Sequence, residues 1–280
     1  SGFDIGANFA AAITGMHMNI HVCHIQGGEV SGTVDEVIRH GITKFAHIHF
    51  PATEKSARRI IRLGEDPKYV FNVGSPSLDT IKMTNYLPKK EIYKKYNLDP
   101  AKKLIIFIQH PVTTEVNSVT KQINQSIKAM HSVKKKYNTQ TLAIYTNNDA
   151  GGRRIIQELN NSGIKVLPHI VYEDFLNLMK WADALVGNSS SGIHEAPSFG
   201  LPVVNIGSRQ QYRERAVNVI DVDHNSKAIT LAVEKALFDT KFIKKVKSAK
   251  NPYDNGFTAQ KVVKILETMK LPPIQKVITY

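Results

Sequence analysis

The sequence contains one cysteine, Cys23, and no apolar run near the ~20 residues that a membrane-spanning helix needs. A single cysteine can form neither a disulfide framework nor a cysteine metal site within one chain, so a reducing compartment, the cytoplasm, is expected. No basic and apolar leader opens the sequence. These absences together favour a soluble enzyme that is not inserted in a membrane.

Acidic residues are also scarce, since 24 aspartates and glutamates stand against 37 lysines and arginines, for a formal net charge of +13. This balance favours anionic ligands. The lysines gather on the solvated faces of expected helices, at 134–136 and 241–250, and no stripe of basic and aromatic residues accompanies them. Nucleic acid is therefore not expected as a partner.

With 280 residues the chain exceeds one typical domain. Short β-branched runs alternate with helical patterns, which is typical of parallel sheets wrapped by helices. We predict an α/β fold of two lobes, residues 1–90 and 91–250, with a final segment, 251–280, whose helix would cross back to the first lobe. The predicted strands cover residues 18–24, 44–50, 68–73, 103–109, 141–145, 164–168, 183–186, 202–205 and 217–221.

The stretch Gly187–Glu195 (Gly-Asn-Ser-Ser-Ser-Gly-Ile-His-Glu) follows a predicted buried strand and opens a predicted helix. Ser189 and Ser190 would place hydroxyls and unpaired backbone N–H groups at the helix N-terminus, which suits a phosphate. Glu195, about one turn further, would face the sugar hydroxyls of the molecule that carries the phosphate. This combination predicts a nucleotide-sugar site.

A second candidate site is the segment His24-Ile-Gln-Gly-Gly-Glu-Val-Ser-Gly, where a buried strand ends in Gly27 and Gly28. Two glycines allow a ligand to approach the backbone closely. The helix that follows carries two i,i+4 pairs, Asp35–Arg39 and Glu36–His40. One face of this helix would meet a sugar. The alternative is a capping box with two helix ion pairs.

Histidines supply a third candidate site. His110 ends an apolar strand and is followed by Pro111. It is either a hydrogen-bond donor to a phosphate or an acid/base, or else a polar residue that only caps the strand. His17, His21 and His24 share a strand region, but their spacing does not converge on one face of a strand. We predict no metal site and no cofactor.

Taken together, these segments resemble the hydrolysing UDP-N-acetylglucosamine 2-epimerases, the type that opens sialic-acid and related sugar pathways. The resemblance covers nearly the whole chain and rests on six segments in order: His24–Gly32, Asp35–Lys44, Gln109–Thr114, Asn147–Gly151, Gly187–Glu195 and Gly207–Gln210. It implies a glycosyltransferase-B-like fold of two Rossmann-type lobes with a UDP-sugar in the cleft. It also implies a homodimer or a dimer of dimers.

In enzymes of this type UDP leaves from C1 while a base takes the C2 proton, and water adds to the resulting glycal to release N-acetylmannosamine. The resemblance implies that the UDP is bound by Ser189, Ser190, Glu195, Arg209, Asn147 and His169, with Glu195 on the ribose. It implies a catalytic set of Asp35, His110, Gln26 and Glu36, led by Asp35 as acid/base. The implied sugar contacts are Gly27, Gly28, Glu29 and Arg39.

Two departures from the family pattern leave alternatives open. Gln26 stands where many members carry a glutamate, and an amide cannot exchange protons near neutral pH. Family members also begin with strand–helix units that precede the part matched here, so we expect the first lobe to be incomplete. The alternatives are the same chemistry on a UDP-2,4-diacetamido-trideoxyhexose, a non-hydrolysing epimerase, a two-lobed glycosyltransferase, and a UDP-sugar-binding fragment without turnover.

Overall fold

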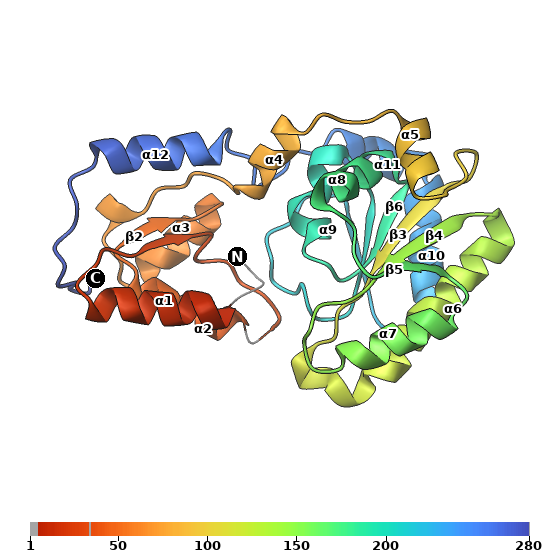
Figure 1. Cartoon of the computed structure of the whole chain (residues 1–280), viewed down its shortest axis with the longest axis horizontal. Helices are drawn as coiled ribbons and strands as arrows, with labels where there is room; N and C mark the ends of the chain where they lie inside the picture. Colours follow the sequence, from red (N-terminus) through yellow and green to blue (C-terminus); the bar gives the residue numbers. More distant parts are fainter. Residues whose placement is uncertain (1–4, 34, 280) are drawn as a thin grey trace. The chain divides into compact units, whose positions relative to one another are not determined.

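The computed structural model of the chain describes residues 5–33 and 35–279, which form two compact units (Figure 1). Unit 1 comprises the N-terminal residues through Lys82, the short segment Tyr212–Glu214 and the C-terminal residues from Pro252. Unit 2 comprises Met83–Gln211 and Arg215–Asn251. The chain thus passes from unit 1 to unit 2 after Lys82, a few residues before the expected position, and its C-terminal segment belongs with unit 1.

Unit 2 contains a six-stranded sheet whose neighbouring strands all run parallel. The strand order is β5-β4-β3-β6-β7-β8, so the direction of winding reverses between β3 and β6, as in a Rossmann fold. Every residue of β3, β6 and β7 is buried, which explains their mostly apolar sequences. The strands are β3 (Leu104–Ile108), β4 (Gln140–Ile144), β5 (Lys165–Leu167), β6 (Ala184–Gly187), β7 (Val203–Ile206) and β8 (Val219–Val222).

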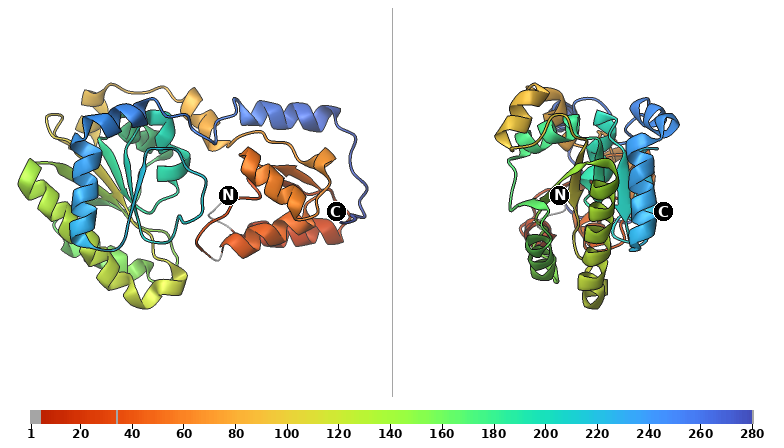
Figure 2. Two further views of the ribbon diagram at one scale, coloured as in Figure 1. Left: turned by 180° about the vertical axis from the view of Figure 1, so that it is seen from behind. Right: turned by 90° about the vertical axis from the view of Figure 1, so that its right-hand side faces the viewer.

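Helices cover both faces of this sheet (Figure 2). Ile105 and Phe107 of β3 lie in the core formed with α6 (Val119–Tyr137), α7 (Gly152–Asn161) and α10 (Ser226–Phe238). The alternate residues Leu104 and Ile106 face the other side, where α8 (Tyr172–Trp181) packs against β3 and α5 (Lys89–Lys95). The remaining helical elements are α9 (Ser191–His194), α11 (Thr240–Lys247) and the 3₁₀ turns Thr113–Ser118 and Ala196–Phe199.

Unit 1 contains two short parallel strands, β1 (Cys23–Ile25) and β2 (Ile48–Phe50). Apolar side chains of the C-terminal helix, Val262 and Ile265, pack against the buried residues of β2. This helix therefore contributes to the core of the first unit. The helical elements are α1 (Ile5–His17), α2 (Asp35–Phe45), α3 (Glu54–Arg62), the 3₁₀ turn Pro67–Tyr69, α4 (Ser77–Met83) and α12 (Thr258–Thr268).

All six strands predicted between residues 103 and 221 are confirmed, but the three predicted in unit 1 need correction. Residues 68–73 form no strand, because Asp66 caps a 3₁₀ turn at Pro67; the chain then runs beside β2 with only an isolated bridge between Val70 and His49. The predicted strand 18–24 begins at Cys23, because residues 18 and 19 close the end of α1. The predicted strand 44–50 begins at Ile48, because α2 continues to Phe45.

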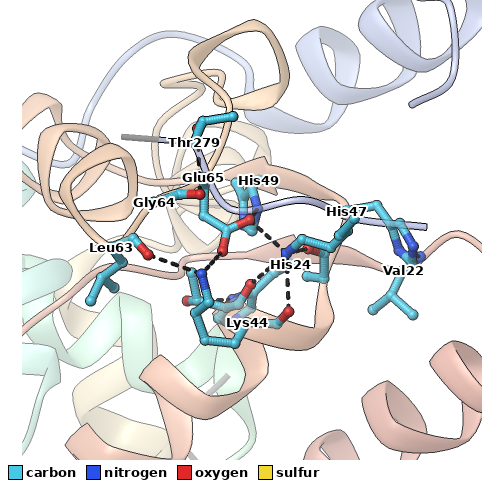
Figure 3. A network of polar contacts seen from close by, with 12 residues as sticks. Val22, His24, Lys44, His47, His49, Leu63, Gly64, Glu65 and Thr279 are labelled. Carbon is cyan, nitrogen blue, oxygen red and sulfur yellow. Dashed lines mark hydrogen bonds and ion pairs between the residues drawn. The ribbon is translucent and has the colours of Figure 1, made fainter. Parts of the chain in front are cut away.

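A buried carboxylate, Glu65, fixes the C-terminal residues to unit 1 (Figure 3). It accepts from Lys44 at 2.7 Å, from Lys276 at 2.6 Å and from the His49 Nε2 at 3.0 Å. Beside it, the Thr279 N–H donates to the Gly64 carbonyl at 3.0 Å. Burial alone would raise the pKa of Glu65, but the hydrogen bonds from His49, Lys276 and Lys44 lower it to about 2. The group is therefore ionised at neutral pH.

Candidate functional site

In unit 2 the predicted nucleotide-binding residues follow the carboxyl ends of parallel strands. In the order of the sheet from β5 to β7, they are His169, Asn147, His110, Ser189 with Ser190, and Arg209. The carboxyl ends of parallel strands lie along one edge of a sheet, so these residues share that edge. β3 and β6 are neighbours at the point where the winding reverses, which is where open α/β sheets bind ligands.

Asn188 joins the ends of β3 and β6. Its side-chain oxygen accepts from the His110 N–H at 2.6 Å, and its side-chain nitrogen donates to the His110 carbonyl at 2.9 Å. Its own carbonyl accepts from Arg209 at 3.2 Å and from Gln210 at 2.8 Å. One asparagine therefore fixes the backbone at His110 and the loop after β7 to the start of the turn between β6 and α9, residues 187–190, called the serine turn below.

His110 is buried, and its ring nitrogens have distinct roles. Nδ1 accepts from the Asn147 N–H at 3.1 Å and lies 3.0 Å from the Thr146 hydroxyl. Burial, followed by the positive charge of Arg209, lowers the pKa of His110 to about 3, so the imidazole is neutral near pH 7. Because Nδ1 accepts a proton donor, the proton of the neutral ring is on Nε2. His110 is thus equipped to donate a hydrogen bond to an anionic oxygen.

The serine turn differs from the prediction in the length of its helix. Gly187 has φ +128°, and a Cβ there would lie 1.9 Å from the Ile108 carbonyl oxygen, so glycine is required. The helix that follows, α9, has only four residues, and Glu195 lies just beyond it rather than inside it. So short a helix has little dipole. Any phosphate bound here would depend on the hydroxyls and N–H groups of Ser189 and Ser190 themselves.

The other predicted UDP residues have different surroundings. Glu195 is buried. Its negative charge adds to the effect of desolvation, which is the larger cause, in raising the pKa of Tyr172. Asn147 donates to Asp149 at 2.6 Å and lines a surface hollow of about 360 Å³ formed by residues 147–154 and 156. His169 is exposed, just after β5. All three belong to the carboxyl side of the sheet in unit 2.

In unit 1, residues 26–29 form the turn after β1. Gln26 has φ +59°, and its side-chain amide donates to the Ser75 hydroxyl at 2.8 Å. A Cβ on Gly27 would lie 2.6 Å from the ring of His24, and a Cβ on Gly28, at φ +75°, would lie 2.4 Å from the Ser56 carbonyl oxygen. Packing within unit 1 therefore requires both glycines, independently of any ligand.

Three arginines hold this turn. Arg39 donates to the Glu29 carbonyl at 3.2 Å, Arg59 donates to the Gly28 carbonyl, and Arg213 pairs with the Glu29 carboxylate at 2.7 Å. Burial and the neighbouring Arg213 lower the pKa of Arg39, while the charges of Glu29, Asp35 and Glu36 oppose this shift. The structure thus brings Glu29, Arg39 and the start of α2 within electrostatic reach of one another.

The two acids at the start of α2 are used differently. Glu36 accepts from the Ser31 N–H at 2.5 Å and from His40 at 3.3 Å, so the predicted Glu36–His40 pair is confirmed. The predicted Asp35–Arg39 pair is not formed, because Arg39 reaches to Glu29 instead. Asp35 is half-buried, and its side chain has no hydrogen bond or ion pair with any residue that the structure describes.

Sequence reasoning did not single out Arg213, Arg59, Ser75 or Asn188. Arg213 and Glu29 are 184 positions apart, and Asn188 and His110 are 78 apart, so periodicity and spacing could not connect them. A weak signal did exist, because the segment 207–215 carries three arginines directly after a strand.

Two further findings hold for the described ranges, 5–33 and 35–279. No three or more histidine, cysteine, aspartate or glutamate side chains gather there in a way that could hold a metal ion. No helix in these ranges has both the length and the apolar character needed to cross a membrane.

Comparison with known proteins gives consistent matches. A family model described as UDP-N-acetylglucosamine 2-epimerase matches residues 4–267. The UDP-N,N'-diacetylbacillosamine 2-epimerase (hydrolyzing) of Legionella pneumophila is 41% identical over 96% of this chain and 70% of its own length. The UDP-N-acetylglucosamine 2-epimerase of Neisseria meningitidis serogroup B is 36% identical over 94% of this chain and 68% of its own.

The fold is also that of solved structures. The crystal structure of the Neisseria meningitidis UDP-GlcNAc 2-epimerase bound to UDP-GlcNAc superposes with a TM-score of 0.80 at 20% identity, over 93% of this chain and 73% of that one. The predicted α/β fold of the glycosyltransferase-B type is therefore confirmed, with a six-stranded parallel sheet in unit 2 and a two-stranded one in the described part of unit 1. The present chain spans about 70% of the length of these relatives.

Proposed function

The chain belongs to the UDP-N-acetylglucosamine 2-epimerase family, and we propose that it is a hydrolysing 2-epimerase that converts UDP-N-acetylglucosamine into N-acetylmannosamine and UDP. The observation that supports this most is the 41% identity to a Legionella protein whose name states a hydrolysing 2-epimerase. Polar residues at the carboxyl ends of β1 and of β3 to β7 supply donors and acceptors of the kind this reaction needs.

In this proposal unit 2 binds the UDP. His110 donates from Nε2–H to a diphosphate oxygen, and the hydroxyls of Ser189 and Ser190 donate beside it. The Arg209 guanidinium adds a positive charge that stabilises the departing diphosphate. Glu195 accepts from the ribose hydroxyls. Asn147 and His169 complete the proposed set of UDP-binding residues.

Unit 1 acts on the sugar. We assign the base at C2 to Asp35, because its carboxylate has no side-chain partner in the described part of the chain, whereas both oxygens of Glu36 are engaged. Gln26 hydrogen-bonds but does not exchange protons. The proposed sugar contacts are Gly27, Gly28, Glu29 and Arg39.

The proposed reaction has two steps. The Asp35 carboxylate removes the C2 proton, the electron pair of the C2–H bond forms the C1–C2 double bond of a glycal, and the C1–O bond to UDP breaks. Water then adds its oxygen to C1, and C2 receives a proton from the opposite face. The products are UDP and the free 2-epimer of the sugar.

A second candidate substrate is a UDP-2,4-diacetamido-trideoxyhexose. Identity is 41% to the Legionella protein, named for UDP-N,N'-diacetylbacillosamine, and 36% to the Neisseria protein, named for UDP-N-acetylglucosamine. The test is the rate of UDP release from each sugar nucleotide. A preference of about tenfold or more in kcat/KM identifies the substrate. Tight UDP binding without release from either would favour a UDP-sugar-binding protein without turnover.

We further propose that the protein acts as a homodimer or homotetramer in the cytoplasm, in a route to sialic or legionaminic acid. The support is the family resemblance and the presence of one cysteine in the sequence. Sedimentation of the purified chain at several concentrations would measure the assembly; a monomer at all of them would contradict it.

A further inference from the structure

The ion pair between Arg213 and Glu29 joins residues that lie far apart in the sequence. The guanidinium and carboxylate are 2.7 Å apart, and the two side chains are only 9% and 6% exposed. Glu29 belongs to the turn after β1, whereas Arg213 comes from the loop after β7, in which Arg209 lies four residues earlier. Only Tyr212–Glu214 of that loop belong to unit 1.

The backbone around Arg213 is fixed on both sides. Tyr212 has φ +67°, a conformation that a tyrosine adopts only when its surroundings impose it. On the other side, the Glu214 carbonyl accepts from the buried Tyr253 hydroxyl at 2.7 Å, and the Glu214 carboxylate lies 3.5 Å from Lys55. Arg213 is therefore presented to Glu29 from a backbone with little freedom.

The turn that carries Glu29 is also fixed by hydrogen bonds. Arg39 donates to the Glu29 carbonyl and Arg59 to the Gly28 carbonyl, so the backbone of this turn is fixed. Arg213 in turn donates to one oxygen of the Glu29 carboxylate, so the side chain is held in one direction as well. Buried ion pairs contribute little net stability compared with apolar packing, so stabilisation alone explains this arrangement poorly.

We infer that Arg213 is a positioning residue, which fixes the Glu29 carboxylate so that it meets the sugar of the UDP-sugar in one orientation. This inference rests on the proposed function, in which Glu29 contacts the sugar. A carboxylate held by a guanidinium accepts from a sugar hydroxyl or acetamido N–H without first having to be ordered. The hexose ring is thereby placed for proton removal at C2.

The test compares Arg213→Gln, Arg213→Lys, Glu29→Gln and the double variant Glu29→Gln/Arg213→Gln with the unaltered chain. The matched control is Arg62→Gln, which removes one exposed positive charge from α3 of the same unit. The measurements are kcat and KM for UDP release, UDP affinity by calorimetry, and the thermal midpoint. The double variant removes both charges of the ion pair, and so separates the loss of the pair from the effect of leaving one of its charges buried.

We expect Arg213→Gln to lower kcat by roughly 100-fold, the loss typical of a reacting group misplaced by about 1 Å, while UDP affinity stays within about twofold. Arg213→Lys should recover about a tenth of the original rate. The double variant should be no slower than Glu29→Gln alone, since the two residues act as a unit. Equal kcat in Arg213→Gln and Arg62→Gln, or fully additive losses in the double variant, would overturn the inference.

A failure of the proposed function is recognised separately. If the unaltered chain releases UDP from neither sugar nucleotide, the proposed function is wrong, and intact UDP-N-acetylglucosamine can then be used for calorimetry. Under those conditions Arg213→Gln should bind the sugar nucleotide at least about tenfold more weakly while binding UDP equally. Equal affinities for both ligands in the two proteins would contradict the positioning role of Arg213.

Discussion

At the scale of single residues, the chemistry proposed for unit 2 depends on hydrogen bonds between backbone groups and the side chains of His110 and Asn188. The Asn147 N–H occupies Nδ1 of His110, and Asn188 holds the His110 backbone from both sides. A histidine fixed in this way and kept neutral by burial is suited to hydrogen bonding, and poorly suited to proton transfer near pH 7. We therefore place proton transfer in unit 1 and leaving-group stabilisation in unit 2.

The proposed ribose contact of Glu195 can be tested by removing its carboxylate. Glu195→Ala should weaken UDP binding by about 10- to 100-fold, the usual cost of losing a charged hydrogen-bond acceptor. Calorimetry with UDP measures this. Glu91→Ala, which removes an exposed carboxylate from α5, is the control and should bind UDP normally. Unchanged affinity in Glu195→Ala would remove the ribose role.

The assignment of the base is tested by Asp35→Asn. The amide keeps the size of the side chain but cannot take a proton, so kcat should fall by about 1,000-fold with UDP affinity unchanged. Glu54→Gln, an exposed acid in the first turn of α3, should keep normal kcat. An Asp35→Asn variant with full activity would show that another group removes the C2 proton.

At the scale of secondary-structure elements, the strands of unit 2 were predictable because each is a short run rich in apolar residues, and β3, β6 and β7 are buried along their whole length. Unit 1 was less predictable, because its strands have three residues each and depend on partners elsewhere. Pro67 stopped a strand that the β-branched and aromatic residues 68–73 favoured. The length of α9 could not be foreseen either, since Pro197 leaves room for a helix after Gly187 without requiring one.

The attachment of the C-terminal residues to unit 1 gives a prediction of pH dependence. The folded pKa of Glu65, about 2, lies below its ordinary value of 4.5, so its ionisation stabilises the fold above pH 4.5. That contribution is lost as the pH falls from 4.5 toward 2. Glu65→Gln should therefore cost about 3 kcal/mol of unfolding free energy at pH 7, and roughly half of that or less at pH 3.

Urea unfolding at both pH values measures this difference. Glu267→Gln, which changes an exposed carboxylate on α12 of the same unit, should cost almost nothing at either pH. An equal loss from Glu65→Gln at pH 3 and pH 7 would mean that the carboxylate charge does not hold the C-terminal residues.

At the scale of the whole molecule, the family and the fold could be predicted because six motifs occur in order along nearly the entire chain. The motifs also indicated His110, the serine turn and the Gln26–Glu29 turn as candidate positions. They could not show that Tyr212–Glu214 belong to unit 1, since that depends on contacts such as Arg213 with Glu29. Motif order identifies which residues matter, whereas their partners follow only from the tertiary structure.

We propose that this chain eliminates UDP from a UDP-sugar and returns a proton to C2 from solvent. The most direct measurement is incubation of the unaltered chain with UDP-N-acetylglucosamine, and in parallel with the UDP-2,4-diacetamido sugar, in deuterated water, followed by proton NMR of the sugar. We predict free UDP and a free 2-epimer that carries deuterium at C2. Release of a free sugar with its original C2 proton and configuration would contradict the claim, as would the absence of UDP release from both substrates.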